Sequence, residues 1–110
     1  MTNMTGGQAI IQTLINHDVT TMFGLPGVQL DNTFDALFEA RNTLRTIHTR
    51  HEQGAAYMAL GYAQASGKVG ACIVGPGPGL LNASAALCTA YGSNVPVICI
   101  AGQVPSHQIA

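Results

Sequence analysis

Charged side chains are scarce in this sequence of 110 residues. Four Lys and Arg and five Asp and Glu make up 8% of the chain, where an average soluble domain carries about 25%. The net charge of −1 provides no basic surface for nucleic acid or an anionic membrane, and a hydrophobic content of 47% excludes a disordered chain. We therefore expect a folded domain whose surface is largely covered by other domains or another subunit, or else consists of uncharged polar residues.

Long hydrophobic runs and a secretory leader are also missing. The longest apolar stretches, such as residues 95–101, are too short to span a bilayer, and the first seven residues predict no signal peptide. The three cysteines, Cys72, Cys88 and Cys99, are odd in number and have no C-x-x-C spacing. This pattern predicts reduced core residues of a cytoplasmic protein rather than disulfides or a zinc site.

Helical and strand patterns alternate along the chain. Helices are predicted over residues 6–17 with Thr5 as the cap, from Asp31 or Asn32 to residue 38, over 53–66 with Gly67 at the end, and over 80–91. The last of these has Leu80, Ser84, Leu87, Cys88 and Tyr91 on one stripe. Strands are predicted over 19–23, 44–48, 69–74 and 95–101. Continuous apolar strands joined by helices indicate a parallel sheet buried on both faces. We expect a three-layer α/β fold with an open parallel sheet and helices on both faces, truncated at its C-terminus.

Glycine turns follow the predicted strands, where an open parallel sheet binds its ligands. The run Gly-Pro-Gly-Pro-Gly at 75–79 lacks the Gly-Lys-Ser/Thr of a phosphate-binding loop and the glycine spacing of a dinucleotide site. It indicates either a tight turn or a turn that lets a ligand approach the backbone. His51 and Glu52 are not followed by a second histidine at residue 55, so the zinc-protease motif is excluded and we expect no metal site.

Glu52 has two interpretations. Thr49 and Glu52 have the spacing of a capping box, in which Thr49 caps the helix and Glu52 is its third residue. On a helix, however, Glu52 also shares an apolar face with Ala56 and Ala59. Burial there raises the pKa of its carboxyl and the helix N-terminus lowers it. A buried carboxyl at a strand end is a candidate for proton transfer with a ligand, so the residues themselves leave both interpretations open.

Five segments match one enzyme family in its own order and cover nearly the whole chain. They are Phe-Gly-Leu-Pro-Gly at 23–27, Arg-His-Glu-Gln-Gly-Ala-Ala-Tyr-Met-Ala-Leu-Gly-Tyr-Ala at 50–63, Gly-Pro-Gly-Leu-Leu-Asn at 77–82, Val-Pro-Val at 95–97 and Ala-Gly-Gln-Val-Pro at 101–105. Together these segments resemble the N-terminal, pyrimidine-binding domain of thiamine-diphosphate (ThDP) enzymes of the acetolactate synthase type.

This resemblance implies a catalytic role for Glu52. The matching glutamate hydrogen-bonds N1′ of the cofactor's aminopyrimidine and favours its 4′-imino form, which removes the C2 proton of the thiazolium. The resulting ylid attacks a 2-oxo acid and accepts the electrons of decarboxylation. The resemblance places Pro26 and Gly27 at the thiazolium, Val28, Gln29 and Gln103 on the substrate side, and Gly77, Pro78, Gly79 and Asn82 beside the pyrimidine.

The resemblance also implies parts that residues 1–110 do not contain. In the family, a separate C-terminal domain with a G-D-G…N motif holds the diphosphate and Mg²⁺, a middle domain holds FAD in some members, and the active site forms between two subunits. We expect residues 1–110 to be an incomplete pyrimidine-binding domain without turnover of its own, in a homodimer or tetramer that acts on a 2-oxo acid.

Two loops depart from the acetolactate synthase pattern and leave the substrate open. Residues 24–29 read Gly-Leu-Pro-Gly-Val-Gln where that pattern has Gly-Tyr-Pro-Gly-Gly-Ala, and Gly75-Pro76 stands in place of Thr-Ser. Both decarboxylation and carboligation are compatible with the sequence. A non-catalytic assembly or regulatory domain and a separate-chain subunit of a split decarboxylase are the alternative functions.

Overall fold

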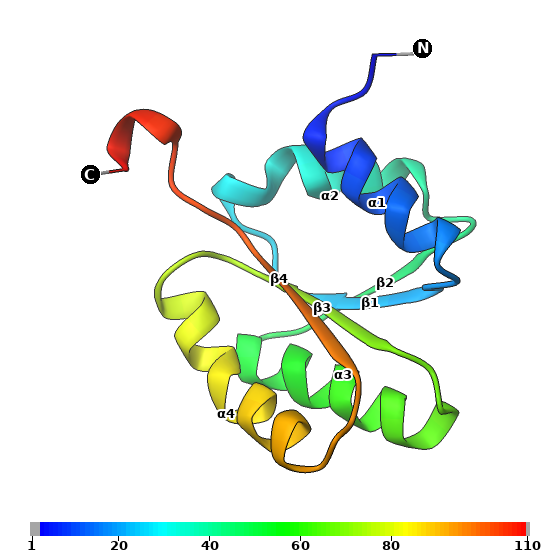
Figure 1. Cartoon of the computed structure of the whole chain (residues 1–110). Coiled ribbons are helices and arrows are strands. Elements are labelled where there is room, and N and C mark those ends of the chain that lie inside the picture. The colour runs from blue at the N-terminus through cyan, green and yellow to red at the C-terminus, as the bar shows by residue number, and fades with distance from the viewer. Residues whose placement is uncertain (1–2, 110) are drawn as a thin grey trace.

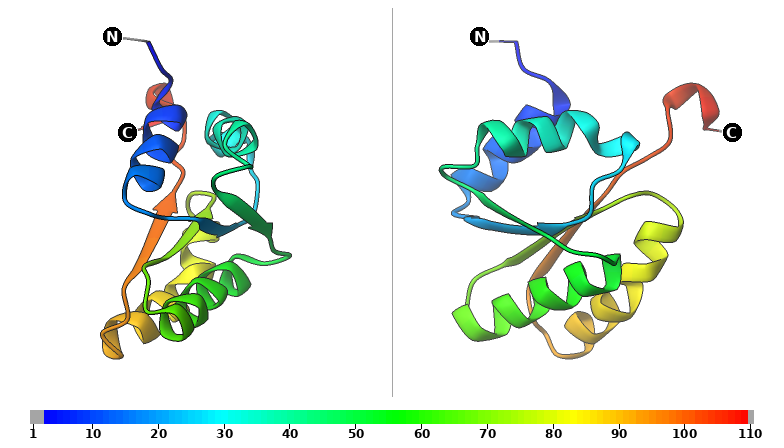
Figure 2. Two further views of the ribbon diagram at one scale, coloured as in Figure 1. Left: turned by 90° about the vertical axis from the view of Figure 1, so that its right-hand side faces the viewer. Right: turned by 180° about the vertical axis from the view of Figure 1, so that it is seen from behind.

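The computed structural model describes residues 3–109 (Figure 1). The elements are α1 (Gly6–Asn16), β1 (Thr21–Gly24), η1 (Val28–Leu30), α2 (Asp31–Glu39), β2 (Arg45–His48), α3 (Glu52–Ser66), β3 (Gly70–Val74), α4 (Pro78–Gly92), β4 (Val97–Ala101) and η2 (Ser106–Gln108). The four strands form one parallel sheet in the order β2-β1-β3-β4. Helices α1 and α2 cover one face and α3 and α4 the other (Figure 2), which confirms the predicted three-layer α/β fold.

Alternate side chains of the central strands point to opposite faces of the sheet and pack against different pairs of helices. On the α1/α2 side the core contains the larger aliphatic side chains, Ile11, Leu14, Val19, Met22, Leu30, Leu37, Leu44 and Ile73, with Ala36 and Ala71. On the α3/α4 side it contains Phe23, Cys72 and Val74 with five alanines, Ala55, Ala56, Ala59, Ala83 and Ala86. Every residue of β3 is buried, which explains why this strand is continuously apolar in the sequence.

The helix ends confirm some of the predicted caps and correct one. The Thr5 hydroxyl accepts from the backbone N–H of Gln8, and the Gln8 side chain accepts from the backbone N–H of Thr5. Gly67 ends α3 at φ 70°, where glycine is favoured. The prediction that Asp31 or Asn32 caps α2 is wrong: the helix continues directly from η1 and begins after Leu30 without a side-chain hydrogen bond.

Helix α4 packs through a different face from the one its large residues predict. The expected contact stripe includes Leu80, Leu87, Cys88 and Tyr91. The buried residues are instead the small ones, Gly79, Ala83, Ala86 and Ala90, and Tyr91 is 88% exposed. Cys88 is therefore not the core residue it was predicted to be, whereas Cys72 is buried and Cys99 half-buried, all as free thiols. Only small side chains fit where α4 lies against α3.

Within residues 3–109, none of the helices combines the length and the apolar character needed to cross a membrane.

Candidate functional site at the carboxyl ends of the strands

The loops that follow the four strands are joined by backbone hydrogen bonds at one edge of the sheet. The N–H of Thr49, after β2, donates to the carbonyl of Gly24 at the end of β1 (3.0 Å), and the N–H of Leu25 donates to Ile73 (3.3 Å). The N–H of Gly102, after β4, donates to Val74 at the end of β3 (3.0 Å). These hydrogen bonds hold the loops of the predicted ligand-binding edge against one another and against the strand ends.

The start of α3 differs from the predicted capping box. His51, not Thr49, is the N-cap, and its Nδ1 accepts from the backbone N–H of Gln53 at 3.1 Å. The buried Thr49 hydroxyl lies 3.0 Å from the carbonyl oxygen of His51 and 3.5 Å from that of Gly24. The Thr49 hydroxyl donates to the His51 carbonyl within the β2–α3 loop, and the Thr49 backbone N–H holds that loop onto β1, so Thr49 does not cap the helix. The capping-box interpretation of Glu52 is wrong, and no local pattern predicts this role of Thr49.

Glu52 is the first residue of α3 and faces α4. Its Oε2 accepts a hydrogen bond from Asn82 Nδ2 at 3.0 Å. That bond lowers the pKa of the Glu52 carboxyl below its ordinary value, helped by the residue's own backbone N–H and by His51, and opposed by partial burial. The carboxyl was expected to be buried; it is only partly so, because it lies where the alanine face of α3 meets solvent. It is therefore ionised at neutral pH.

The turn between β3 and α4 passes close to this carboxylate. Gly77 has φ 60°, a conformation that favours glycine, and Pro78 occupies the first turn of α4, where proline is well accommodated. A Cβ placed on Gly79 would lie 3.5 Å from Glu52 Oε1. The structure thus brings Glu52, Gly79 and Asn82 together from two helices.

The residues predicted to face the substrate lie on the loops after β1 and β4. A Cβ on Gly102 would lie 3.2 Å from Pro76 and 3.4 Å from Gln29, so the loops after β1, β3 and β4 touch there. Pro26 and Gly27 lie in the loop between β1 and η1, and Val28 is 77% exposed. The Gln103 side chain accepts from the N–H of Val104 at 2.8 Å. In the part of the chain that the structure describes, no hydrogen bond links Glu52 to Val28, Gln29 or Gln103.

Two hollows of the surface lie away from this edge. One of about 390 Å³ lies between α1 and α2, and one of about 400 Å³ lies beside β4 and is lined by Val69 and Ile98. Neither of these two hollows is lined by Glu52 or by the glycine turns. Residues 3–109 contain no group of three His, Cys, Asp or Glu side chains that could hold a metal ion.

Comparison with known proteins identifies the family. Residues 4–110 match the thiamine pyrophosphate enzyme N-terminal TPP binding domain, TPP being another name for ThDP. The chain is 47% identical over 106 residues to a Haemophilus influenzae protein whose name gives no activity, covering 96% of this chain and 39% of that protein.

Two further relatives are named for reactions. One is the "Probable 2-ketoarginine decarboxylase AruI" of Pseudomonas aeruginosa, 44% identical over 97 residues, which are 88% of this chain and 17% of that protein. The other is an acetolactate synthase of Mycobacterium avium, 43% identical over 101 residues, 92% of this chain and 16% of that protein. The chain thus spans well under half the length of these relatives, and it belongs to the family of the thiamine pyrophosphate enzyme N-terminal TPP binding domain.

Proposed function

We propose that this chain supplies the aminopyrimidine-binding part of a ThDP-dependent enzyme that decarboxylates 2-oxo acids, with or without joining the product to a second carbonyl compound. The observation that carries the proposal is the Glu52 carboxylate, fixed by Asn82 at the carboxyl edge of a parallel sheet and facing a glycine turn. Relatives named as an acetolactate synthase and a 2-ketoarginine decarboxylase support the reaction class.

Glu52 would act on the proton at N1′ of the pyrimidine. Its lowered pKa keeps the carboxyl ionised, so it can accept a hydrogen bond from a protonated ring nitrogen and share that proton. Asn82 occupies Oε2 and holds the carboxylate in one orientation, while Oε1 faces the side of Gly79. The residues present therefore fit an aminopyrimidine that approaches along the glycine turn.

The other predicted residues would shape the surroundings of the cofactor. Gly77, Pro78 and Gly79 would contact the pyrimidine through a turn that carries no bulky side chain, and Pro26 and Gly27 would lie at the thiazolium. Val28, Gln29 and Gln103 would face the substrate. ThDP, when bound, supplies the electron sink that decarboxylation of a 2-oxo acid needs.

The rest of the active site would come from other parts of the enzyme. The chain covers 16% to 39% of the relatives described above. We propose that further domains, including that of a second subunit, supply the contacts to the diphosphate and Mg²⁺ and, where it is used, to FAD.

Exposed apolar residues support an interface with a second copy of the chain, in a homodimer or tetramer. They lie on α3 and α4 and are Tyr57, Met58, Leu81 and Tyr91. Three free thiols are in keeping with a cytoplasmic location.

A binding titration tests the assignment on the 110-residue chain. We expect ThDP to shift the backbone amide NMR signals of Glu52, Gly79 and Asn82, with weak affinity because the diphosphate contacts lie elsewhere. Glu52→Gln should weaken this binding. The matched control is Glu39→Gln, which makes the same chemical change at the end of α2, away from the site. ThDP-induced shifts that are the same in wild type and Glu52→Gln would count against the role of Glu52.

The catalytic part of the proposal needs the longer enzyme. Decarboxylation of a 2-oxo acid should be absent in the isolated chain and present in the enzyme that carries the remaining domains. There, Glu52→Gln should slow exchange of the ThDP C2 proton by about 10²-fold or more, with the fold intact by circular dichroism and Glu39→Gln unaffected. Full exchange in Glu52→Gln would instead favour a non-catalytic assembly or regulatory domain. Activity on mixing the isolated chain with a separate diphosphate-binding chain would indicate a split decarboxylase.

A further inference from the structure

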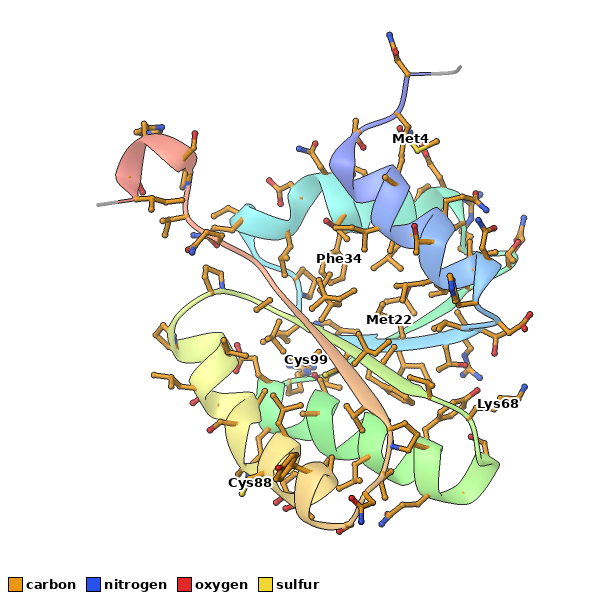
Figure 3. All side chains as sticks on the ribbon, in the orientation of Figure 1. Met4, Met22, Phe34, Lys68, Cys88 and Cys99 are labelled. Atoms are coloured by element: carbon orange, nitrogen blue, oxygen red, sulfur yellow. The ribbon has the colours of Figure 1, made fainter. Side chains whose placement is uncertain are left out.

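Two of the three thiols stand opposite each other in the sheet. Cys72 of β3 and Cys99 of β4 are register partners in neighbouring parallel strands, and partners in such a ladder point to the same face. Neighbouring strands lie about 4.7–4.9 Å apart, which falls within the range of about 4.4–6.8 Å between the Cα atoms of a disulfide. Cys72 belongs to the apolar cluster beneath α3 and α4, and Cys99 packs against it; Figure 3 labels Cys99 near the sheet and Cys88 on α4.

The two thiols differ in environment. Cys72 is fully buried, whereas Cys99 is only half-buried and lies on β4, the edge strand of the sheet. The neighbouring Cys99, together with burial, raises the pKa of the Cys72 thiol, whereas the neighbouring Cys72 lowers the pKa of the Cys99 thiol. Cys99 is therefore the thiol that reacts first with a small electrophile, and Cys72 is placed to resolve the product.

We propose that Cys72 and Cys99 form a reversible disulfide between β3 and β4 when the protein meets a peroxide, a modification site independent of the proposed cofactor site. The Cys99 thiol gives up its proton, and the thiolate attacks one oxygen of hydrogen peroxide; the O–O bond breaks, the leaving hydroxide takes up that proton as water, and a sulfenic acid forms. Cys72 then passes its proton to the departing hydroxyl group as its sulfur attacks the Cys99 sulfur; the S–O bond breaks and a second water leaves. Two thiols lose two electrons and peroxide gains them.

The position of the pair gives the bond a consequence at the sheet edge. Cys72 lies two residues before the end of β3, and Cys99 two residues before the end of β4. The turns that follow these ends are the two that meet where Gly102 packs against Pro76. A disulfide would therefore fix β4 to β3 directly beneath the contact between these turns.

The test uses the full 110-residue chain and its Cys88→Ser variant, in which Cys72 and Cys99 are the remaining thiols. After treatment with hydrogen peroxide, the protein is unfolded and free thiols are alkylated. No Lys or Arg follows Lys68, so trypsin alone leaves all three cysteines in one peptide. Chymotrypsin, which cuts after Tyr91, separates Cys99 from the other two. The digest is analysed by mass spectrometry without reductant.

We expect both thiols of Cys88→Ser to disappear together, with the loss of two hydrogen atoms in mass, a linked Cys72–Cys99 peptide, and full recovery on reduction with dithiothreitol. In Cys88→Ser with Cys72→Ser, Cys99 should instead be trapped as a sulfenic acid by dimedone. Two results would overturn the proposal: Cys99 oxidised while Cys72 stays free for alkylation, or both thiols remaining free after Cys88 of the unaltered chain has been consumed. The unaltered chain gives the same readout if a serine variant fails to fold.

Discussion

The two helical layers of the molecule cover the same sheet with side chains of different size. Beneath α1 and α2 the contacts come mostly from large aliphatic residues such as Leu37 and Ile73, whereas α3 and α4 meet the sheet and each other mainly through alanines. A Cβ on Gly70 of β3 would collide with the backbone carbonyl of Ala59 in α3. Small residues thus let backbones approach closely, which brings Glu52 within reach of Asn82.

The difference has a functional side. The aliphatic layer gains stability from the area that it buries, and none of the predicted site residues lies on α1 or α2. The alanine layer buries less area per residue but determines how far apart the ends of α3 and α4 lie, and with them the carboxylate and amide of the candidate site. We therefore expect substitutions in the first layer to affect mainly stability, and substitutions in the second to affect site geometry as well.

The largest effect is expected in the aliphatic layer. Leu37, 2% exposed, lies in α2 against the sheet, and Leu37→Ala should lower the free energy of unfolding by about 2–5 kcal/mol because it removes buried methyl groups and leaves a cavity. Leu81→Ala, at a 71% exposed position of α4, is the control and should change the free energy of unfolding by less than about 0.5 kcal/mol. Urea unfolding measures both, and equal losses would contradict the division into layers.

Overpacking the alanine layer should have the next largest effect. Ala83 is fully buried against α3, and Ala83→Leu should cost about 1–3 kcal/mol because the added atoms force the two helices apart. Since the same displacement lengthens the Glu52–Asn82 hydrogen bond, the pKa of Glu52 should rise, as followed by NMR titration. Ala85→Leu places the same side chain on the exposed side of α4. A loss of stability without any change in the Glu52 pKa would contradict the expectation that packing between α3 and α4 determines the geometry of the site.

The caps at the start of α1 and α3 give a smaller contrast. Thr5 is part of a reciprocal pair of hydrogen bonds with Gln8, whereas His51 accepts a single one. Thr5→Ala should therefore cost about 1 kcal/mol and His51→Ala about 0.5 kcal/mol, measured by thermal unfolding. A greater loss at His51 than at Thr5 would mean that the histidine ring has structural contacts beyond capping.

The smallest effect concerns pH. Because the folded state lowers the pKa of Glu52 below the ordinary value of 4.5, the ionised carboxyl stabilises the protein above that value, and this contribution is lost as the pH falls through the lower folded pKa. Asn82→Ala should raise the Glu52 pKa toward 4.5 and remove part of the loss of stability in acid. In a Glu52→Gln background, Asn82→Ala should have no pH-dependent effect; if it does, another group is responsible.

Local sequence signals predicted the elements well because each depends on neighbouring residues. Apolar periodicity gave all four helices and all four strands to within a few residues, and Thr5 and Gly67 act at the helix ends as predicted. The errors arise where a distant partner competes. Thr49 has the spacing of a helix cap, yet its backbone N–H donates to the carbonyl of Gly24 on another strand, and His51 caps the helix instead. The predicted contact face of α4 was wrong because only small side chains fit between α4 and α3.

The sequence by itself determined the alternation of helix and strand, the glycine turns at the strand ends and the family, because these depend on residue type and short spacing. The tertiary structure alone decided that His51 caps α3, that Glu52 is held by a side chain 30 residues away and that Cys72 faces Cys99. Such pairs depend on strand order and helix distance, which arise only when the whole chain packs.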